Sequence, residues 1–157
     1  MSPSVFRCQA VLAAAVLLLP FAAAKAGDDS VSVSVVAVLA TDQNDKIDPK
    51  LEGIAKEIQK TDPTLTGFRI VKRLEKKIAV GAKDDFDLGN DQTLRVVVQQ
   101  KSDKDGRCQL KVTPPKMGDV TYLTTCCGKF LPILTPVRTK DDELLIIGVG
   151  VQPCPDK

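Results

Sequence analysis

The segment from Glu143 to Val151 most constrains the fold, because it is apolar on both faces. Apolar residues fill Leu144–Ile147 and recur at Val149 and Val151. Successive strand residues point to opposite faces of a sheet, so such a run needs cover on both sides. We therefore predict a strand in the middle of a sheet, with a helix packed over it.

One helix is indicated. Asp48 is a suitable N-cap, and Pro49 suits the first helical position because its missing N–H costs nothing there. Asp62-Pro63 ends the segment, since the residue before proline is disfavoured in helical conformation. Apolar residues recur at helical spacing along one face, at Leu51, Ile54, Ala55 and Ile58.

The remaining segments predict a mostly antiparallel sheet. Val31–Ala40 (VSVSVVAVLA) predicts a strand that passes from half-buried to buried. Phe68–Val80 predicts two short strands broken near 74–76, followed by an acidic turn around Phe86. The further strands are expected at Leu94–Val98, in a hairpin of Cys108–Thr113 with Val120–Thr125, and in a hairpin of Phe130–Thr139 with Glu143–Val151. The fold class is α+β: a single domain with one helix packed on a mostly antiparallel β-sheet and two disulfides.

Residues 1–26 have the features of a cleavable secretory signal. A short start carries Arg7 and no acid, an apolar run follows from Ala10 to Ala24, and Ala24-Lys25-Ala26 gives an A-x-A cleavage pattern. About 15 apolar residues span about 22 Å as a helix, short of the ~30 Å hydrocarbon core, and Pro20 also disfavours a membrane anchor. We expect cleavage near Ala26, one domain over residues 27–157, no membrane span after cleavage, and a secreted or periplasmic location.

Cleavage also changes the charge balance. The whole chain has 22 basic and 20 acidic residues; Arg7 and Lys25 leave with the signal, so the mature chain has 20 of each. A balanced charge gives no counterion-release drive toward nucleic acid and little attraction to an anionic membrane. We expect no nucleic-acid partner.

Four cysteines remain once Cys8 leaves with the signal: Cys108, Cys126, Cys127 and Cys154. An even number in an exported chain predicts disulfides. If residues 115–119 and 139–142 form the two hairpin turns, Cys108 lies opposite Cys126 and Cys127 lies opposite Cys154. Adjacent strand residues point to opposite faces, so Cys126 and Cys127 reach different partners.

We therefore prefer Cys108–Cys126 with Cys127–Cys154. A one-residue slip gives the swapped pairing, Cys126–Cys154 with Cys108–Cys127, and a strained vicinal bridge ranks third. Zinc is a weaker reading of the same cysteines, because adjacent cysteines fit a tetrahedral ion poorly and the usual Cys-x-x-Cys knuckles are missing.

The composition removes much of the usual catalytic chemistry. The chain has no histidine, which excludes Ser-His-Asp and Cys-His nucleophilic catalysis. It has no tryptophan, and only three phenylalanines and one tyrosine follow the signal, too few for a base-stacking or sugar-stacking platform. No phosphate loop, dinucleotide fingerprint or nucleophile elbow occurs. We expect no catalytic residue, no cofactor and no metal site.

Two acidic clusters are the remaining candidates for chemistry. The first resembles the start of an EF-hand loop, but Ile47 stands where glycine is needed and no bidentate Glu follows, so we favour a solvated loop whose last acid caps the helix. The second is most simply a polar turn. The clusters are Asp42, Asn44, Asp45 and Asp48, and then Asp84, Asp85, Asp87 and Asp91.

Two stretches resemble a group of small exported bacterial proteins that have no assigned activity. They are Asp48–Phe68 (DPKLEGIAKEIQKTDPTLTGF) and Thr121–Cys154, with its Thr-Cys-Cys-Gly-Lys-Phe core and its Val-Gln-Pro-Cys end. The resemblance covers under half of the mature chain and implies export. Secreted cystatins are similar in architecture alone, since the Gln-x-Val-x-Gly and Pro-Trp loops of those inhibitors are missing.

These observations favour a non-enzymatic exported module that binds an envelope protein or surface component through an edge strand or a hairpin loop. A metal-dependent hydrolase that uses calcium or zinc in the acidic loops is one alternative. A cystatin-like protease inhibitor is the other.

Overall fold

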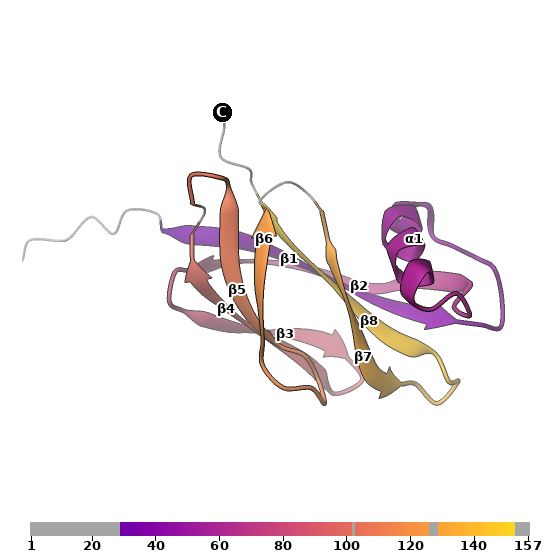
Figure 1. The fold of residues 1–157 in the computed structure, drawn as a ribbon. Coiled ribbons are helices and arrows are strands. Elements are labelled where there is room, and N and C mark those ends of the chain that lie inside the picture. The colour runs from indigo at the N-terminus through magenta and orange to yellow at the C-terminus, as the bar shows by residue number, and fades with distance from the viewer. Residues whose placement is uncertain (1–28, 102, 126–128, 153–157) are drawn as a thin grey trace, which may run out of the picture.

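The computed structural model describes residues 29–101, 103–125 and 129–152, and it contains one short helix and two four-stranded sheets (Figure 1). The first sheet has the order β2-β1-β8-β7 and the second the order β3-β4-β5-β6. All ladders between strands are antiparallel. The elements are β1 (Ser30–Thr41), the 3-10 turn η1 (Pro49–Leu51), α1 (Glu52–Thr61), β2 (Gly67–Ala79), β3 (Lys83–Gly89), β4 (Gln92–Gln100), β5 (Arg107–Thr113), β6 (Val120–Thr125), β7 (Leu131–Arg138) and β8 (Leu144–Gln152).

The predicted α+β class is confirmed, but the expectation of a single sheet is wrong. After β2 the chain turns at Gly81, where φ is +82° and the N–H donates to the carbonyl of Val98 at 2.7 Å. Strands β3 to β6 then form a separate meander, and β7 and β8 return to the first sheet. Consecutive strands form hairpins throughout the second sheet, and β7 and β8 do so in the first, so the sequence pattern alone does not show where the chain changes sheets.

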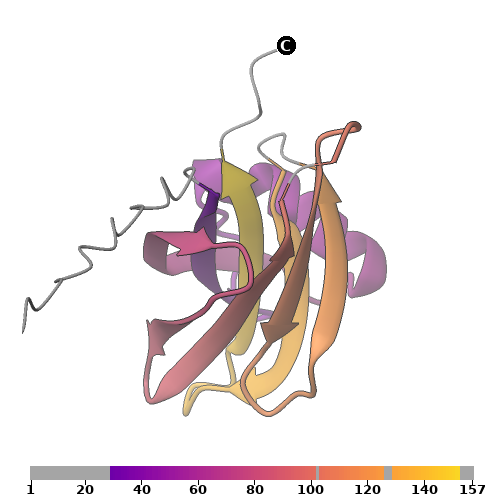
Figure 2. The same ribbon diagram turned by 90° about the vertical axis from the view of Figure 1, so that its left-hand side faces the viewer.

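The main hydrophobic core lies between the two sheets (Figure 2). Alternate residues of β1, such as Val33 and Val35, face it from one side, while Phe86, Val96 and Leu110 face it from the other. All five side chains are at most 1% exposed. The molecule is therefore a two-sheet sandwich over this part of its length.

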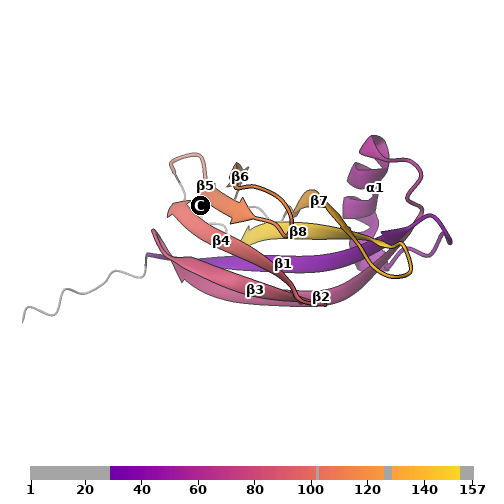
Figure 3. The same ribbon diagram turned by 90° about the horizontal axis from the view of Figure 1, so that it is seen from below.

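A second core lies between α1 and the opposite face of the first sheet. Val36 and Val38 of β1 meet Ala55 and Ile58 of the helix there, together with Ile146 of β8. Strand β8 is buried on both faces and lies between β1 and β7, which confirms the position expected for it. Figures 1 and 3 show α1 at one end of the long strands and the second sheet toward the other.

The helix begins and ends as its sequence predicts. Asp48 Oδ1 accepts from the N–H of Lys50 at 2.9 Å, and the segment ends at Asp62 before Pro63. The first turn, Pro49–Leu51, is a 3-10 turn rather than α-helix. No helix in the described ranges is long and apolar enough to cross a bilayer.

Two expectations between residues 67 and 89 are wrong. Gly67–Ala79 is one continuous strand, not two, because it pairs along its whole length with β1 through a single bulge at Val71. Lys83–Gly89 is strand β3 rather than an acidic turn. Phe86 and Leu88 point into the sandwich core while the acids beside them face water, so alternation decided the structure and not the acid content.

Both late hairpins are confirmed, but both expected registers are wrong. Cys108 lies opposite Thr124 rather than Cys126, because Pro114 and Pro115 lack N–H groups and the β5–β6 ladder ends at Val112–Val120. In the second hairpin a register shift lies between Leu134 and Arg138.

That shift removes the alignment from which the second disulfide was predicted. In the β7–β8 ladder, Leu131 lies opposite Val149, one position away from the expected register. Cys126, Cys127 and Cys154 lie outside the described residues, so both disulfides stay predictions. Cys108 itself is buried in the sandwich core.

The ring of Phe130 covers the outer face of β8 at Gly148 and Gly150. Adding a Cβ to Gly150 would place it 3.2 Å from the ring of Phe130, and one added to Gly148 would lie 3.5 Å from the same ring. The Arg73 guanidinium lies over this ring, 5.9 Å from its centroid. The two glycines thus leave the space that Phe130 occupies.

Candidate functional site

The first acidic cluster forms a loop between β1 and η1. Asn44 Oδ1 accepts from the N–H of Lys46 at 3.0 Å, Asp42 accepts from the Gln43 amide at 2.7 Å, and Asp48 caps η1. Across the parts of the chain that the structure describes, no group of three or more histidine, cysteine or acidic side chains is placed to hold a metal ion. The cap role that we predicted for Asp48 is confirmed.

The second acidic cluster is distributed along β3 and its turn. Asp84 pairs with Lys76 at 2.6 Å, Asp85 with Arg95 at 2.8 Å and Asp87 with Lys72 at 2.8 Å. Hydrogen bonds from these cations lower the pKa of all three carboxyl groups. The pairs to Lys72 and Lys76 join β3 to β2, so the cluster links the edges of the two sheets. Asp91 does not take part and lies in the β3–β4 turn.

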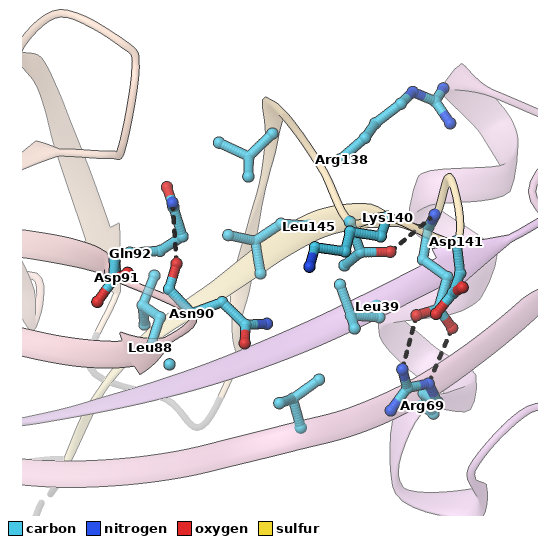
Figure 4. Close-up of a pocket in the computed structure, with 15 residues that line it drawn as sticks. Leu39, Arg69, Leu88, Asn90, Asp91, Gln92, Arg138, Lys140, Asp141 and Leu145 are labelled. Carbon is cyan, nitrogen blue, oxygen red and sulfur yellow. Dashed lines mark hydrogen bonds and ion pairs between the residues drawn. The ribbon is translucent and has the colours of Figure 1, made fainter.

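A cavity opens at the end of the sandwich where two hairpin turns meet (Figure 4). Its volume is about 560 Å³. The β3–β4 turn forms one wall and the β7–β8 turn the other, so each sheet contributes one turn. The apolar floor consists of Leu39, Val71, Leu88, Val137 and Leu145. We refer to this cavity as the end cleft.

Val71 is the most accessible part of the floor. Val71 is 41% exposed, whereas the other four floor residues are at most 6% exposed. It occupies the bulge in β2, where the ladder to β1 skips one residue. A bulge re-aims a side chain, and here it leaves an apolar group accessible inside the end cleft.

Arg69 and Glu143 form a bidentate ion pair on the β2 side of the end cleft. Arg69 Nε donates to Glu143 Oε1 at 2.9 Å, and Nη2 donates to Oε2 at 2.6 Å. Leu39 of β1 lies opposite Arg69 in the β1–β2 ladder and opposite Leu145 in the β1–β8 ladder. The Arg69–Glu143 ion pair therefore reaches across β1, from β2 to the start of β8. These hydrogen bonds lower the pKa of Glu143 and raise that of Arg69.

A smaller hollow of about 370 Å³ lies on the other side of this ion pair. Leu39, Arg69 and Glu143 line both spaces. The acidic loop closes the smaller one, and it packs so tightly that a Cβ added to Gly67 would lie 2.5 Å from Asn44 Oδ1. The Arg69–Glu143 pair therefore forms the wall between the end cleft and the loop.

The two turns carry the hydrogen-bonding groups of the rim. Asn90 and Asp91 have φ values of +52° and +58°, as in a two-residue type I′ hairpin turn. In the β7–β8 turn, Arg138 binds the carbonyl of Asp142 at 2.8 Å, and Figure 4 shows its guanidinium directed away from the cleft. The Lys140 ammonium points inward, toward the side of Asn90 (Figure 4). An ammonium and an amide thus face an apolar floor.

Acidification is expected to remove the contribution of Glu143 to stability. Its pKa in the folded chain lies below the ordinary value of 4.5, so the contribution is present above that value and is lost as the pH falls through the folded pKa. The stability difference between wild type and Glu143→Gln, about 1 kcal/mol or less for a partly exposed pair, should shrink between about pH 6 and pH 3. Urea unfolding at several pH values measures it.

Glu57→Gln is the matched control, since Glu57 pairs with Lys60 on the surface of α1 and both side chains are at least 60% exposed. A smaller difference is expected for this variant. A Glu143→Gln difference that stays constant over the whole pH range would contradict the prediction.

The end cleft was not predicted from the sequence as a site. Asp91 was named only as part of an acidic cluster, and the β7–β8 turn only as a hairpin connection. A signal existed for both turns, in the turn-forming residues Gly89-Asn90-Asp91 and Lys140-Asp141-Asp142. Nothing local in either segment shows that the two turns meet, because they belong to different sheets. No protein-family model, curated protein or solved structure matches this chain.

Proposed function

We propose that residues 27–157 form an exported, non-enzymatic binding module of the periplasm, the envelope or the extracellular space, and that the end cleft holds its protein or surface partner. The signal-like residues 1–26 support export. Strand β1 begins at Ser30, so cleavage near Ala26 removes no part of the described strands or helix.

The observation that carries the proposal is the contrast between the floor and the rim of the end cleft. An apolar centre surrounded by polar groups is the usual anatomy of a protein interface. The volume of about 560 Å³ also lies within the range of ligand-binding cavities. A partner that inserts an apolar side chain against Val71 can accept hydrogen bonds from Lys140 and the amide of Asn90.

The lining residues support binding rather than chemistry. The chain contains no histidine, and the cleft offers one hydroxyl, that of Thr139. This hydroxyl accepts from the N–H of Glu143 at 3.2 Å and so stabilises the turn. The equal numbers of acidic and basic residues in residues 27–157 argue for a partner selected by shape and local hydrogen bonds rather than by bulk charge.

Substitution of Val71 tests the proposal. The mature chain, immobilised, is expected to retain a specific component from an envelope extract of the source organism. Val71→Lys places a charge on the apolar floor and should weaken that binding by about tenfold or more, or about 1.4 kcal/mol. Retention by wild type and variant is quantified by titration with the isolated component.

Val80→Lys is the matched control, because Val80 is 38% exposed but lies just beyond the other end of β2, outside the cleft. It should bind like wild type. Failure of the wild-type chain to retain anything, or equal losses for the two variants, would refute the end cleft as the binding site.

A further inference from the structure

Strand β6 is the least protected sheet edge of the described structure. Within the described residues it pairs with β5 alone, which places it at one side of the second sheet (Figure 2). An edge strand presents backbone N–H and C=O groups to any further strand, so proteins usually blunt such edges with charges, proline or bulges. The sequence of β6, VTYLTT, contains no charge, proline or glycine.

The other three edges carry the usual protection. Strands β2 and β3 are adjacent, and the Lys72–Asp87 and Lys76–Asp84 ion pairs join them at 2.8 and 2.6 Å. Strand β7 contains Pro132 and Pro136 and a register shift. Among the edge strands that the structure describes, β6 alone contains neither a charge, a proline nor a register shift.

Leu123 marks the exposed face of this edge. It is 69% exposed, while the other exposed large hydrophobic residues of the described chain lie between 36% and 41%. It points away from the sandwich core, because Val120 and Tyr122, on the opposite face of β6, pack against that core. A large apolar side chain in the middle of an uncharged edge strand is available to any further strand that pairs with this edge.

We propose that β6 pairs antiparallel with β6 of a second copy of this chain about a two-fold axis at Leu123. Such an axis, perpendicular to the sheet, keeps the core faces of both copies on the same side. Leu123 then lies opposite Leu123 of the second copy, and Thr121 opposite Thr125. The two four-stranded sheets become one sheet of eight strands.

The chemistry of β6 favours a second copy over a foreign strand. Self-pairing about a two-fold axis places the residue on the axis directly opposite its own copy and pairs its neighbours with each other, so a charge at the axis would meet a like charge. No residue from Val120 to Thr125 is charged, and Leu123 is complementary to itself. A six-residue strand buries less area than the ~1,200 Å² usual for stable interfaces, so the dimer is reversible and depends on concentration.

Sedimentation equilibrium of the mature chain from about 10 µM to about 1 mM tests the proposal. Wild type should show a monomer–dimer equilibrium, and Leu123→Lys should weaken it at least about tenfold, since like charges would meet at the axis. Val80→Lys, an equally drastic change at an exposed hydrophobic residue elsewhere, and Val71→Lys in the end cleft should leave this equilibrium unchanged. Val71→Lys also distinguishes the two proposals, because it should weaken binding in the end cleft without changing the dimer.

Cross-linking then tests the register. Leu123→Cys should form a disulfide-linked dimer readily, because directly opposite residues have Cβ atoms about 4.5–5.5 Å apart. Thr121→Cys should do so far more slowly, because Thr121 does not face its own copy. A chain that stays monomeric at about 1 mM, association unaffected by Leu123→Lys, or equal cross-linking of the two cysteine variants would overturn the proposal. So would a monomer whose capture of an envelope component is lost with Leu123→Lys, which would identify a foreign strand as the occupant.

Discussion

Replacing Phe86 with alanine is expected to lower the free energy of unfolding by about 3–5 kcal/mol. Phe86 is fully buried in the middle of β3, where its ring lies in the core between the sheets and under the Lys76 ammonium at 5.2 Å. Truncation removes a large apolar side chain and leaves a cavity that the rigid strands around it cannot fill. Urea unfolding at low protein concentration measures the loss.

Phe86→Ala also tests whether residues 83–89 form a buried strand or the exposed acidic turn that their composition suggests. A phenylalanine in a solvated turn would lose little on truncation. Leu123→Ala is the control, since this leucine is 69% exposed and should cost less than about 0.5 kcal/mol. A loss below about 1.5 kcal/mol for Phe86→Ala would contradict its burial.

Reduction of the mature protein is expected to cost about 3–4 kcal/mol from the bridge at Cys154 alone, because that disulfide would close the 127–154 loop. The intact mass of the exported protein should correspond to residues 27–157 and be lower by about 4 Da than that of the reduced chain, since each disulfide removes two hydrogens. Peptide mapping without reductant identifies the partners. A protein that keeps residues 1–26 would contradict the predicted cleavage, and one that contains four reduced thiols would contradict the predicted disulfides.

The connectivity needs this measurement. The pairing of Cys108 with Cys126 was preferred because the two were expected to face each other, and Thr124 now occupies the position opposite Cys108. The second expected alignment is displaced by one residue in the β7–β8 ladder. The swapped pairing, Cys126–Cys154 with Cys108–Cys127, is therefore no less favoured by strand alignment than the first.

Local patterns predicted the elements whose side chains alternate or recur clearly. The Leu94–Val98 alternation and the capped helix after Asp48 both correspond to the observed elements. Strand β3 was not predicted, because Asp84, Asp85 and Asp87 suggest a solvated turn. The alternation that indicates a strand is nevertheless present, since Phe86 and Leu88 alternate with Asp85 and Asp87. The charges are tolerated because they face outward and pair with lysines and an arginine.

Long-range arrangement could not be predicted in the same way. Strands β1 and β3 have similar alternation, but nothing in either sequence states which sheet it joins. The end cleft depends on this choice, since its floor joins Leu39 and Leu145 of one sheet to Leu88 of the other. The bulge that leaves Val71 accessible is likewise a property of the β1–β2 ladder and not of the residue.

The pairing of β1 with β8 determines when this domain can fold. Val35 lies opposite Val149, so the central strand acquires its second neighbour only when nearly the whole chain is present. Both cores use side chains of these two strands, and neither core is complete before β8 docks. Contacts between such distant segments form late and slowly. Until β8 has been synthesised, the nascent chain therefore lacks the strand that completes both cores.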